Sequence, residues 1–352
     1  MTDVSTIRKF ALVGAGVIGK HHGRVMSQLA DRLELVAVVD IEIERAERLA
    51  AERGGTPFAS LTDALAAVDI DVVVVCTPTG RHGEVAIEAL TAGKHVIVEK
   101  PAEITVAKTD EIIEAQQKAG TVVTVISQHR FDAATETVLA AIHRGELGRL
   151  TSGIASIDWW RGQSYYDSGD WRGTWELDGG GALMNQGVHT VDLLVAALGR
   201  PVEVFAYTGT LAHERIEVED VAVGVVTFES GALGVLHATT AAYPGLSARL
   251  QVHGDRGAAV IDNDQLTFFH ATTEGTEPEE KLMGKNSTRA VPTAGSDPGQ
   301  LSDSHRLQYL NFLGALDGTD QLRVDLETNR QSIGVITGVY ESARTGRPVR
   351  LS

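Results

Sequence analysis

The feature that most constrains the fold is a glycine-rich turn that directly follows the first apolar run of the chain. Residues 7–13 are typical of a buried strand, and the sequence G-A-G-V-I-G then opens a helical pattern. In such a strand–turn–helix unit the first glycine makes the tight turn, the second admits a pyrophosphate, and the third packs helix against strand. The unpaired N–H groups of the helix start would bind the pyrophosphate. The predicted dinucleotide-binding residues here are Gly14, Gly16, Val17, Ile18 and Gly19.

The residue at the end of the second predicted strand indicates which dinucleotide binds. The apolar run 34–39 ends in Asp40, which lies 21 residues after Gly19. An acid at this place accepts hydrogen bonds from the ribose hydroxyls and repels a 2′-phosphate, which favours NAD over NADP. Two observations leave an alternative open. Asp is also a favoured helix cap, and Arg45, one turn into the next helix, is long enough to reach a phosphate.

Strands and helices continue to alternate as far as residue 126, which predicts βαβ units and a parallel sheet. The expected elements are a helix at 61–67, a strand at 71–76, a helix near 82–92, a strand at 95–98, a helix to about 119 and a strand at 121–126. Ligands bind such sheets at the carboxyl ends of the strands. Thr77 and Pro78 follow one strand, and Glu99-Lys100-Pro101 follows another, so Lys100 would project toward a ligand. The alternative is that Glu99 and Lys100 form an ordinary solvated turn.

After residue 130 the pattern changes to strands without intervening helices, which implies an antiparallel sheet. Strands are expected at 151–160, 202–208, 221–228, 232–241, 247–253, 258–261 and 266–269, with helices at about 131–144, 301–316 and 327–345. We therefore predict an α/β Rossmann domain at 1–130, followed at 131–352 by an α+β domain with a large, open, mainly antiparallel sheet. A broad, partly apolar sheet face with nothing in sequence to cover it predicts self-association as a dimer or tetramer.

Between the first of these later strands and the next helix lies a loop that is unusually rich in arginine and aromatic residues. Residues 161–175 contain two arginines, two tyrosines and two tryptophans. Aromatic rings stack on sugar faces, and guanidinium groups bind carboxylates or phosphates in a fork. We assign Arg161 and Tyr165 to substrate recognition. Together with Arg172 and the pair His129-Arg130, Arg161 hints at an anionic substrate, although a loop held down by its own aromatic residues would look similar.

A helix that follows three consecutive glycines, residues 179–181, carries a second candidate site. Asn185 and His189 are four residues apart and Asp192 lies three further on, so the three side chains share one helix face. His189 is a candidate general base because its unperturbed pKa is near ~6.5. Asp192 is expected to orient or cap. A lone histidine on a helix is often only a structural residue, and that reading stays open here.

Taken in order, these motifs make the sequence resemble the Gfo/Idh/MocA oxidoreductase family. The resemblance rests on G-x-G-x-x-G, Asp40, Thr77-Pro78, Glu99-Lys100-Pro101, the signature at 179–192 and the ending at 340–349. It implies a sugar or polyol hydroxyl as substrate, with Lys100 and His189 acting near the nicotinamide. Many members have Asp where this chain has Asn185, which cannot exchange a proton at neutral pH.

The same resemblance supplies further site residues. Trp171 and Arg172 are expected close to cofactor and substrate, and Asn185 and His305 at the substrate, although helix capping explains His305 nearly as well. The remaining cofactor-binding residues implied are Thr77, Pro78, His82, Glu99, Lys100 and Gln128. No metal site is predicted, because the 12 histidines show no H-x-x-x-H or H-E-x-x-H spacing.

The predicted reaction is transfer of a hydride between a secondary hydroxyl of a sugar or polyol and NAD. The base is His189, or a Lys100 whose pKa is lowered; otherwise Lys100 steadies the developing alkoxide. An alternative is a redox-neutral glycoside hydrolase that oxidises, eliminates and reduces again. A third reading, a regulator that only senses the dinucleotide, needs no chemistry at Lys100.

Composition limits the partners and the location. The 31 Lys and Arg against 47 Asp and Glu give a formal charge of −16, which disfavours nucleic acid and anionic membranes. The single cysteine, Cys76, excludes an internal disulfide. No apolar run approaches the roughly 20 residues of a membrane helix, and the first residues lack a secretion signal, so a cytoplasmic location is expected. Residues 271–300 are expected to be an insertion or a lid.

Overall fold

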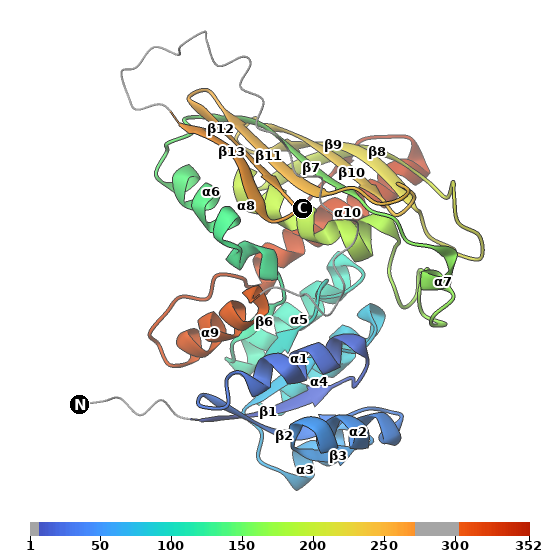
Figure 1. Cartoon of the computed structure of the whole chain (residues 1–352), viewed down its shortest axis with the longest axis vertical. Helices are drawn as coiled ribbons and strands as arrows, with labels where there is room; N and C mark the ends of the chain where they lie inside the picture. Colours follow the sequence, from blue (N-terminus) through green and yellow to red (C-terminus); the bar gives the residue numbers. More distant parts are fainter. Residues whose placement is uncertain (1–6, 272–302) are drawn as a thin grey trace. The chain divides into compact units, whose positions relative to one another are not determined.

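The computed structural model describes residues 7–271 and 303–352. These residues form two compact units (Figure 1). Unit 1 contains residues 7–128, 175–179 and 303–333, and unit 2 contains residues 129–174, 180–271 and 334–352. The domain boundary proposed at residue 130 therefore lies close to the first division, while a stretch near the C-terminus also belongs to unit 1. The segment 271–300, predicted to be an insertion or a lid, lies outside the described residues except for Ala271.

Unit 1 is built on a six-stranded parallel sheet with the order β3-β2-β1-β4-β5-β6. Its strands are β1 Arg8–Val13, β2 Leu33–Val39, β3 Thr56–Phe58, β4 Val72–Val75, β5 His95–Val98 and β6 Val123–Val125. Its helices are α1 Val17–Ser27, α2 Ile43–Arg53, α3 Leu61–Ala67, α4 His82–Thr91, α5 Val106–Ala119, α9 Ser304–Leu316 and the start of α10, Leu326–Thr345, with 3₁₀ turns η1 Thr79–Arg81 and η2 Gln128–Phe131, which begins here. The predicted Rossmann fold is confirmed.

Helices cover both faces of this sheet, which is why its central strands are apolar throughout. All four residues of β4 are buried. One apolar cluster joins the sheet to α3, α4 and α5, and another joins it to α1, α2 and α9. The strand order reverses between β1 and β4, and in open parallel sheets ligands bind outside the carboxyl ends of the strands at such a reversal. Gly14 and Thr77 lie close to those two strand ends.

Unit 2 is built on an eight-stranded sheet with the order β13-β12-β11-β7-β10-β9-β8-β14. All neighbouring strands are antiparallel except β7 and β10. The strands are β7 Leu150–Asp158, β8 Pro201–Gly209, β9 Val221–Phe228, β10 Leu233–Thr239, β11 Ala248–Gly254, β12 Gly257–Asp262, β13 Gln265–Ala271 and β14 Val349–Arg350. The helices are α6 Ala133–His143, α7 Gln163–Tyr166, the π-helix η3 Ala182–Gly187, α8 Val188–Leu198 and the end of α10. The predicted open, mainly antiparallel sheet is confirmed.

One face of the unit 2 sheet is packed and the other carries exposed apolar side chains. In Figure 1, α8 lies along one face of the sheet, where it forms a core with the sheet and with residues of α10. On the other face, β9 and β10 alternate between buried and exposed residues. The sequence did not predict β3, α7 or β14, and it predicted an ordinary α-helix where η3 is a π-helix. Within the described ranges, no helix is both long and apolar enough to cross a membrane.

Candidate functional site

The glycine turn of unit 1 has the geometry that a dinucleotide needs. Gly14 has φ +101°, and a Cβ there would lie 2.5 Å from the Cys76 carbonyl oxygen. A Cβ at Gly19 would lie 1.9 Å from the Gly14 carbonyl oxygen, so helix and turn touch. At Gly16, by contrast, a Cβ would meet no atom within 4 Å. Gly14 and Gly19 are therefore packed against protein backbone, whereas the space beside Gly16 is empty, which is where a pyrophosphate would approach.

Asp40 fastens this turn to the end of β2. Its Oδ2 accepts the backbone N–H of Ala15 at 2.8 Å, and its Oδ1 accepts the backbone N–H of Glu42 at 2.9 Å. Asp40 therefore joins the glycine turn to the backbone that leads into α2. It is not the N-cap of that helix, because the N-cap residue is Glu42. Arg45 forms an ion pair with Glu42 at 2.9 Å, which occupies its guanidinium group.

Two of the predicted cofactor residues carry buried polar atoms that a ligand would satisfy. Thr77 Oγ1 and Gln128 Oε1 are buried, and no described residue forms a hydrogen bond with either atom. A buried oxygen without a partner costs free energy, typically ~1–3 kcal/mol, so such atoms in a ligand site fit a bound group with donors or acceptors of its own. The open glycine turn, Asp40 and these two oxygens together fit NAD.

The end of β5 is held by buried histidines. Glu99 is 4% exposed, and its Oε1 lies 2.8 Å from His22 Nε2. Burial would raise the pKa of Glu99, but the hydrogen bond and charge of His22, with the charges of His305 and Lys100, lower the pKa to about 2. Glu99 is therefore a carboxylate throughout the physiological range. His305, a predicted substrate residue, is 2% exposed and lies in this cluster, with its ring 5.7 Å from that of His22.

His82, predicted at the cofactor, joins two strand ends. Its Nδ1 lies 2.8 Å from the Pro101 carbonyl oxygen and its Nε2 lies 2.9 Å from the Thr77 carbonyl oxygen. A neutral imidazole can donate to only one of the two. Burial, which lowers the pKa of His82, opposes the doubly protonated form. Because both ring nitrogens face backbone carbonyl oxygens, His82 would affect cofactor binding by positioning the loops that contain Thr77 and Pro101.

In unit 2 a buried acid, Glu219, binds the backbone at the start of η3, next to the glycines at residues 179–181. The Glu219 carboxylate accepts N–H groups of Gly181 at 2.9 Å and Leu183 at 2.8 Å, and the Tyr340 hydroxyl at 3.0 Å. A Cβ at Gly181 would lie 1.8 Å from the Glu219 carbonyl oxygen, so only glycine fits there. Burial raises the pKa of Glu219 to about 7, against the hydrogen bonds that favour its charged form. Nothing in the sequence marked Glu219 as part of the site.

Asn185 lies in η3, and His189 and Asp192 lie in the first turns of α8, which follows directly. Arg130 binds Asp192 through two hydrogen bonds of 2.7 Å each, so the carboxylate of Asp192 is engaged by a cation of the same unit. The His129 ring stands edge-on to the His189 ring, with centroids 5.0 Å apart. The structure thus places the predicted base beside a pair of residues, His129-Arg130, that fixes its helix.

His129 is itself held between two carboxylates. Its Nδ1 lies 2.7 Å from Asp132 Oδ2 and 3.0 Å from Asp264 Oδ1, at the turn between β12 and β13. Burial alone would lower the pKa of His129, but the hydrogen bonds and charges of Asp132 and Asp264 raise it to about 10. His129 is therefore a cation at neutral pH.

The arginine-rich loop forms a stack around one tyrosine. The guanidinium carbon of Arg172 lies 4.3 Å from the Tyr165 ring centroid and 4.5 Å from that of Trp171. Arg161 lies 5.4 Å from the Tyr165 ring and 5.0 Å from the Trp159 ring. Gln186, which the sequence did not single out, accepts from Arg161 at 3.3 Å and donates to the Tyr165 hydroxyl at 3.1 Å. Four predicted residues, Arg161, Tyr165, Trp171 and Arg172, therefore lie together, and Gln186 connects two of them to η3.

Neither arginine of this stack forms an ion pair with a carboxylate of the described residues, although the chain has 16 more acidic than basic side chains. Arg161 Nε is buried and without a hydrogen-bond partner among those residues. A neighbouring cation, Arg215, is by contrast paired with Asp167 at 2.8 Å. The stack thus presents uncompensated positive charge.

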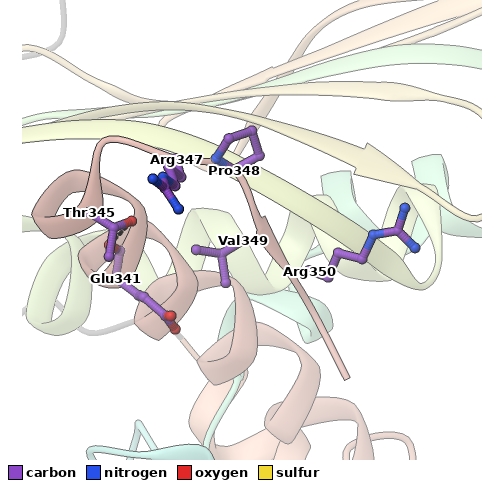
Figure 2. Close-up of a pocket in the computed structure, with 6 residues that line it drawn as sticks. All are labelled: Glu341, Thr345, Arg347, Pro348, Val349 and Arg350. Carbon is purple, nitrogen blue, oxygen red and sulfur yellow. Dashed lines mark hydrogen bonds between the residues drawn. The ribbon is translucent and has the colours of Figure 1, made fainter.

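Two groups of side chains in the described ranges have ligand atoms close enough for a metal ion: His22, Glu99 and His305, and His129, Asp132 and Asp264. In the first group His22 pairs with Glu99, and in the second group His129 pairs with both carboxylates, so neither group carries a metal assignment here. A surface hollow in unit 2 is lined by Glu341, Thr345, Arg347, Pro348, Val349 and Arg350 (Figure 2). It includes none of the predicted site residues.

Comparison with known proteins finds the same oxidoreductase family in the N-terminal and C-terminal parts of the chain. Residues 8–127 match a family model described as an oxidoreductase family with an NAD-binding Rossmann fold. Residues 135–260 match the model of the GFO/IDH/MocA C-terminal domain. Together these matches cover more than half of the chain.

Among solved structures, the WlbA dehydrogenase from Bordetella pertussis, in complex with NADH and UDP-GlcNAcA, is 34% identical. The match covers 99% of each chain with a TM-score of 0.86. Among curated proteins, the D-glucoside 3-dehydrogenase of Escherichia coli is 28% identical, with 97% of each chain covered. The myo-inositol 2-dehydrogenase of Thermotoga maritima is 29% identical over 76% of this chain and 78% of that protein.

Proposed function

Because the chain belongs to the Gfo/Idh/MocA family and is an NAD-binding oxidoreductase, we propose that it oxidises a secondary hydroxyl of a sugar or sugar derivative. NAD takes the hydride from the carbinol carbon while a protein base takes the hydroxyl proton. The observation that carries this proposal is the combination of an open glycine turn at Gly16 with a strand end that presents Lys100. Relatives named as dehydrogenases of glucosides and inositol support the substrate class.

Within this proposal several of the predicted residues have a specific role. His189 is the general base, and Lys100 donates to the substrate oxygen and stabilises the alkoxide that develops. Asn185 offers an amide in place of a carboxylate and binds a substrate hydroxyl. Thr77 and Gln128 would hold the cofactor through their buried oxygens. Trp171 would add an aromatic ring at the cofactor.

We propose further that the substrate carries an anionic group, such as the carboxylate of a uronate. The support is the uncompensated positive charge of Arg161 and Arg172 in a strongly acidic chain. Charged hydrogen bonds between guanidinium and carboxylate are among the strong polar interactions in proteins. The solved relatives that contain UDP-GlcNAcA, at 33% and 34% identity, agree with a negatively charged ligand class.

A second copy of the chain is the proposed partner of the open sheet face in unit 2. Val225 is 53% exposed and pairs across the strands with Val235, which is 41% exposed. On its other side Val225 pairs with Phe205. Tyr207 and Leu233 extend this apolar surface and are 68% and 58% exposed. Contiguous apolar surface of this kind is typical of an interface between subunits.

The substitution Lys100→Met tests the catalytic proposal. Methionine is unbranched and one atom shorter than lysine, and it lacks the ammonium group, so turnover should fall about 100-fold or more while NAD binds nearly as before. The measurements are single-turnover NADH formation with UDP-GlcNAcA, glucuronate and myo-inositol, and the NAD dissociation constant. A loss of turnover below about tenfold would remove Lys100 from the mechanism.

A further inference from the structure

The backbone that carries Lys100 is held at three successive polar groups by side chains. Lys100 N–H donates to Glu99 Oε2 at 2.9 Å, and Ala102 N–H donates to Asn329 Oδ1 at 3.2 Å. Between them the Pro101 carbonyl oxygen lies 2.8 Å from His82 Nδ1, which donates to it in the tautomer that carries the proton on Nδ1. Buried backbone groups are nearly always paired, but pairing to side chains at three consecutive residues is more than a turn requires. The position of this backbone is therefore set by the side chains behind it.

The first of these side chains, Glu99, is itself fixed by His22. Glu99 Oε1 lies 2.8 Å from His22 Nε2, and Oε2 takes the Lys100 N–H, so the two oxygens bridge helix α1 to the catalytic strand end. The side chains of His22 and Glu99 are 0% and 6% exposed. Because both side chains are almost fully shielded from water, the hydrogen bond between His22 and the Glu99 carboxylate is strong.

A third residue sets the orientation of the imidazole. His22 Nδ1 lies 2.7 Å from the hydroxyl oxygen of Tyr309, which is fully buried in α9. A neutral ring satisfies both contacts when Nε2–H donates to Glu99 and Nδ1 accepts the tyrosine O–H, and an imidazolium satisfies both as a double donor. In either form Nε2 donates to Glu99. The result is a buried series Tyr309–His22–Glu99 that ends at the main chain of Lys100.

We propose that His22 is a positioning residue for catalysis, which acts through Glu99 to hold the main chain of Lys100 so that the ammonium group meets the substrate oxygen. This inference rests on the proposed function of Lys100. No role for His22 was predicted from the sequence. The reason that a histidine serves here is geometric: its two ring nitrogens point in different directions and join Tyr309 to Glu99, which an aliphatic side chain cannot do.

The consequence is a loss of rate without a matching loss of cofactor binding. A reacting group displaced by about 1 Å can cost on the order of 100-fold in rate. His22→Leu removes both hydrogen bonds, so we expect hydride transfer to fall about 30-fold or more, with the NAD dissociation constant changed less than about threefold. His22→Gln retains an N–H donor that reaches toward Glu99 and should recover most of the rate.

A double-mutant cycle with Lys100→Met separates positioning from general damage. If His22 acts through Lys100, then His22→Leu should change the rate less than about twofold when Lys100 is already methionine. The cycle is measured as single-turnover NADH formation by the full-length protein with NAD, using whichever of UDP-GlcNAcA, glucuronate and myo-inositol reacts fastest. Melting temperature and circular dichroism confirm that each variant is folded.

The measured rates distinguish the positioning role of His22 from the catalytic role of Lys100. A Lys100→Met variant that keeps its rate overturns the proposed role of Lys100. A Lys100→Met variant that loses its rate, while His22→Leu lowers the rate by the same factor in both backgrounds, overturns only the inference. An unchanged rate in His22→Leu also overturns it. If His22→Leu does not fold, Tyr309→Phe takes its place in the cycle, with a smaller loss expected by the same reasoning and the same overturning results.

Discussion

At the scale of the residue, most of the candidate site could be predicted from the sequence, because the chemistry of these residues depends on their type. The glycines of the turn, Asp40 and Lys100 were singled out for the chemistry of their residue types, and the structure shows the tight turn at Gly14, the Asp40 carboxylate bound to the Ala15 N–H, and Lys100 just after β5. Residues that act through geometry were missed. Gln186, Glu219 and His22 become meaningful only once the fold brings them to Arg161, Gly181 and Glu99.

Arg161→Met tests the proposed anionic substrate, because it keeps an apolar stem against Trp159 and Tyr165 but removes the charge. A charged hydrogen bond contributes about 1.5–3 kcal/mol, so KM for glucuronate or UDP-GlcNAcA should rise about 10-fold to 100-fold. KM for the neutral myo-inositol and the NAD dissociation constant should change by less than about threefold.

The matched control is Arg200→Met, which removes a surface arginine of the same unit that pairs with Glu229. It should leave every constant as in the parent protein. Equal losses for charged and neutral substrates in Arg161→Met would mean that this arginine supports the loop and does not select an anion.

At the scale of the element, predictions succeeded where periodicity decides and failed where it does not. Strand β9 was predicted at its observed bounds because it is a run of eight mostly apolar and β-branched residues, and the apolar run of β4 is equally plain. Strands β3 and β14 contain three and two residues, too few for a period. The residues of the π-helix η3 are compatible with an ordinary helix, and the backbone N–H groups of Leu183 and Met184 bind Glu219 and Tyr340, which are far away in sequence.

The ion pairs of His129 with Asp132, just before α6, and with Asp264, in the β12–β13 turn, predict how stability depends on pH. The pKa of His129 is about 10 in the folded chain, against an ordinary value near ~6.5 in the unfolded chain. A raised pKa means that the folded state binds the extra proton. The stabilisation is therefore fully present below about pH 6.5 and is lost as the pH rises toward 10.

The substitution His129→Gln should accordingly lower the free energy of unfolding by on the order of 1–2 kcal/mol at pH 6, and by progressively less toward pH 10. Urea denaturation at several pH values measures this. His143→Gln, at the end of α6, is the control and should show no such slope. A difference from the parent protein that grows with pH would contradict the assignment of a protonated His129.

At the scale of the whole molecule, the open face of the unit 2 sheet predicts self-association. Val225→Lys with Val235→Lys places two charges at paired positions in the middle of the apolar surface. Burying unpaired charges is strongly unfavourable, so the variant should sediment as a smaller species than the parent protein. An Arg347→Glu control, in the hollow of Figure 2, should sediment as the parent does. A parent protein that sediments as a monomer would contradict the proposed interface.

The central claim, net transfer of a hydride from a sugar to NAD, is tested most directly by following both products of one reaction. The protein is incubated with NAD and an aryl glucuronide, and NADH absorbance and released aglycone are recorded together. The account predicts NADH in proportion to the oxidised sugar, with no aglycone beyond what the oxidised product sheds. Aglycone released catalytically without accumulation of NADH would contradict it and would identify the redox-neutral glycoside hydrolase instead.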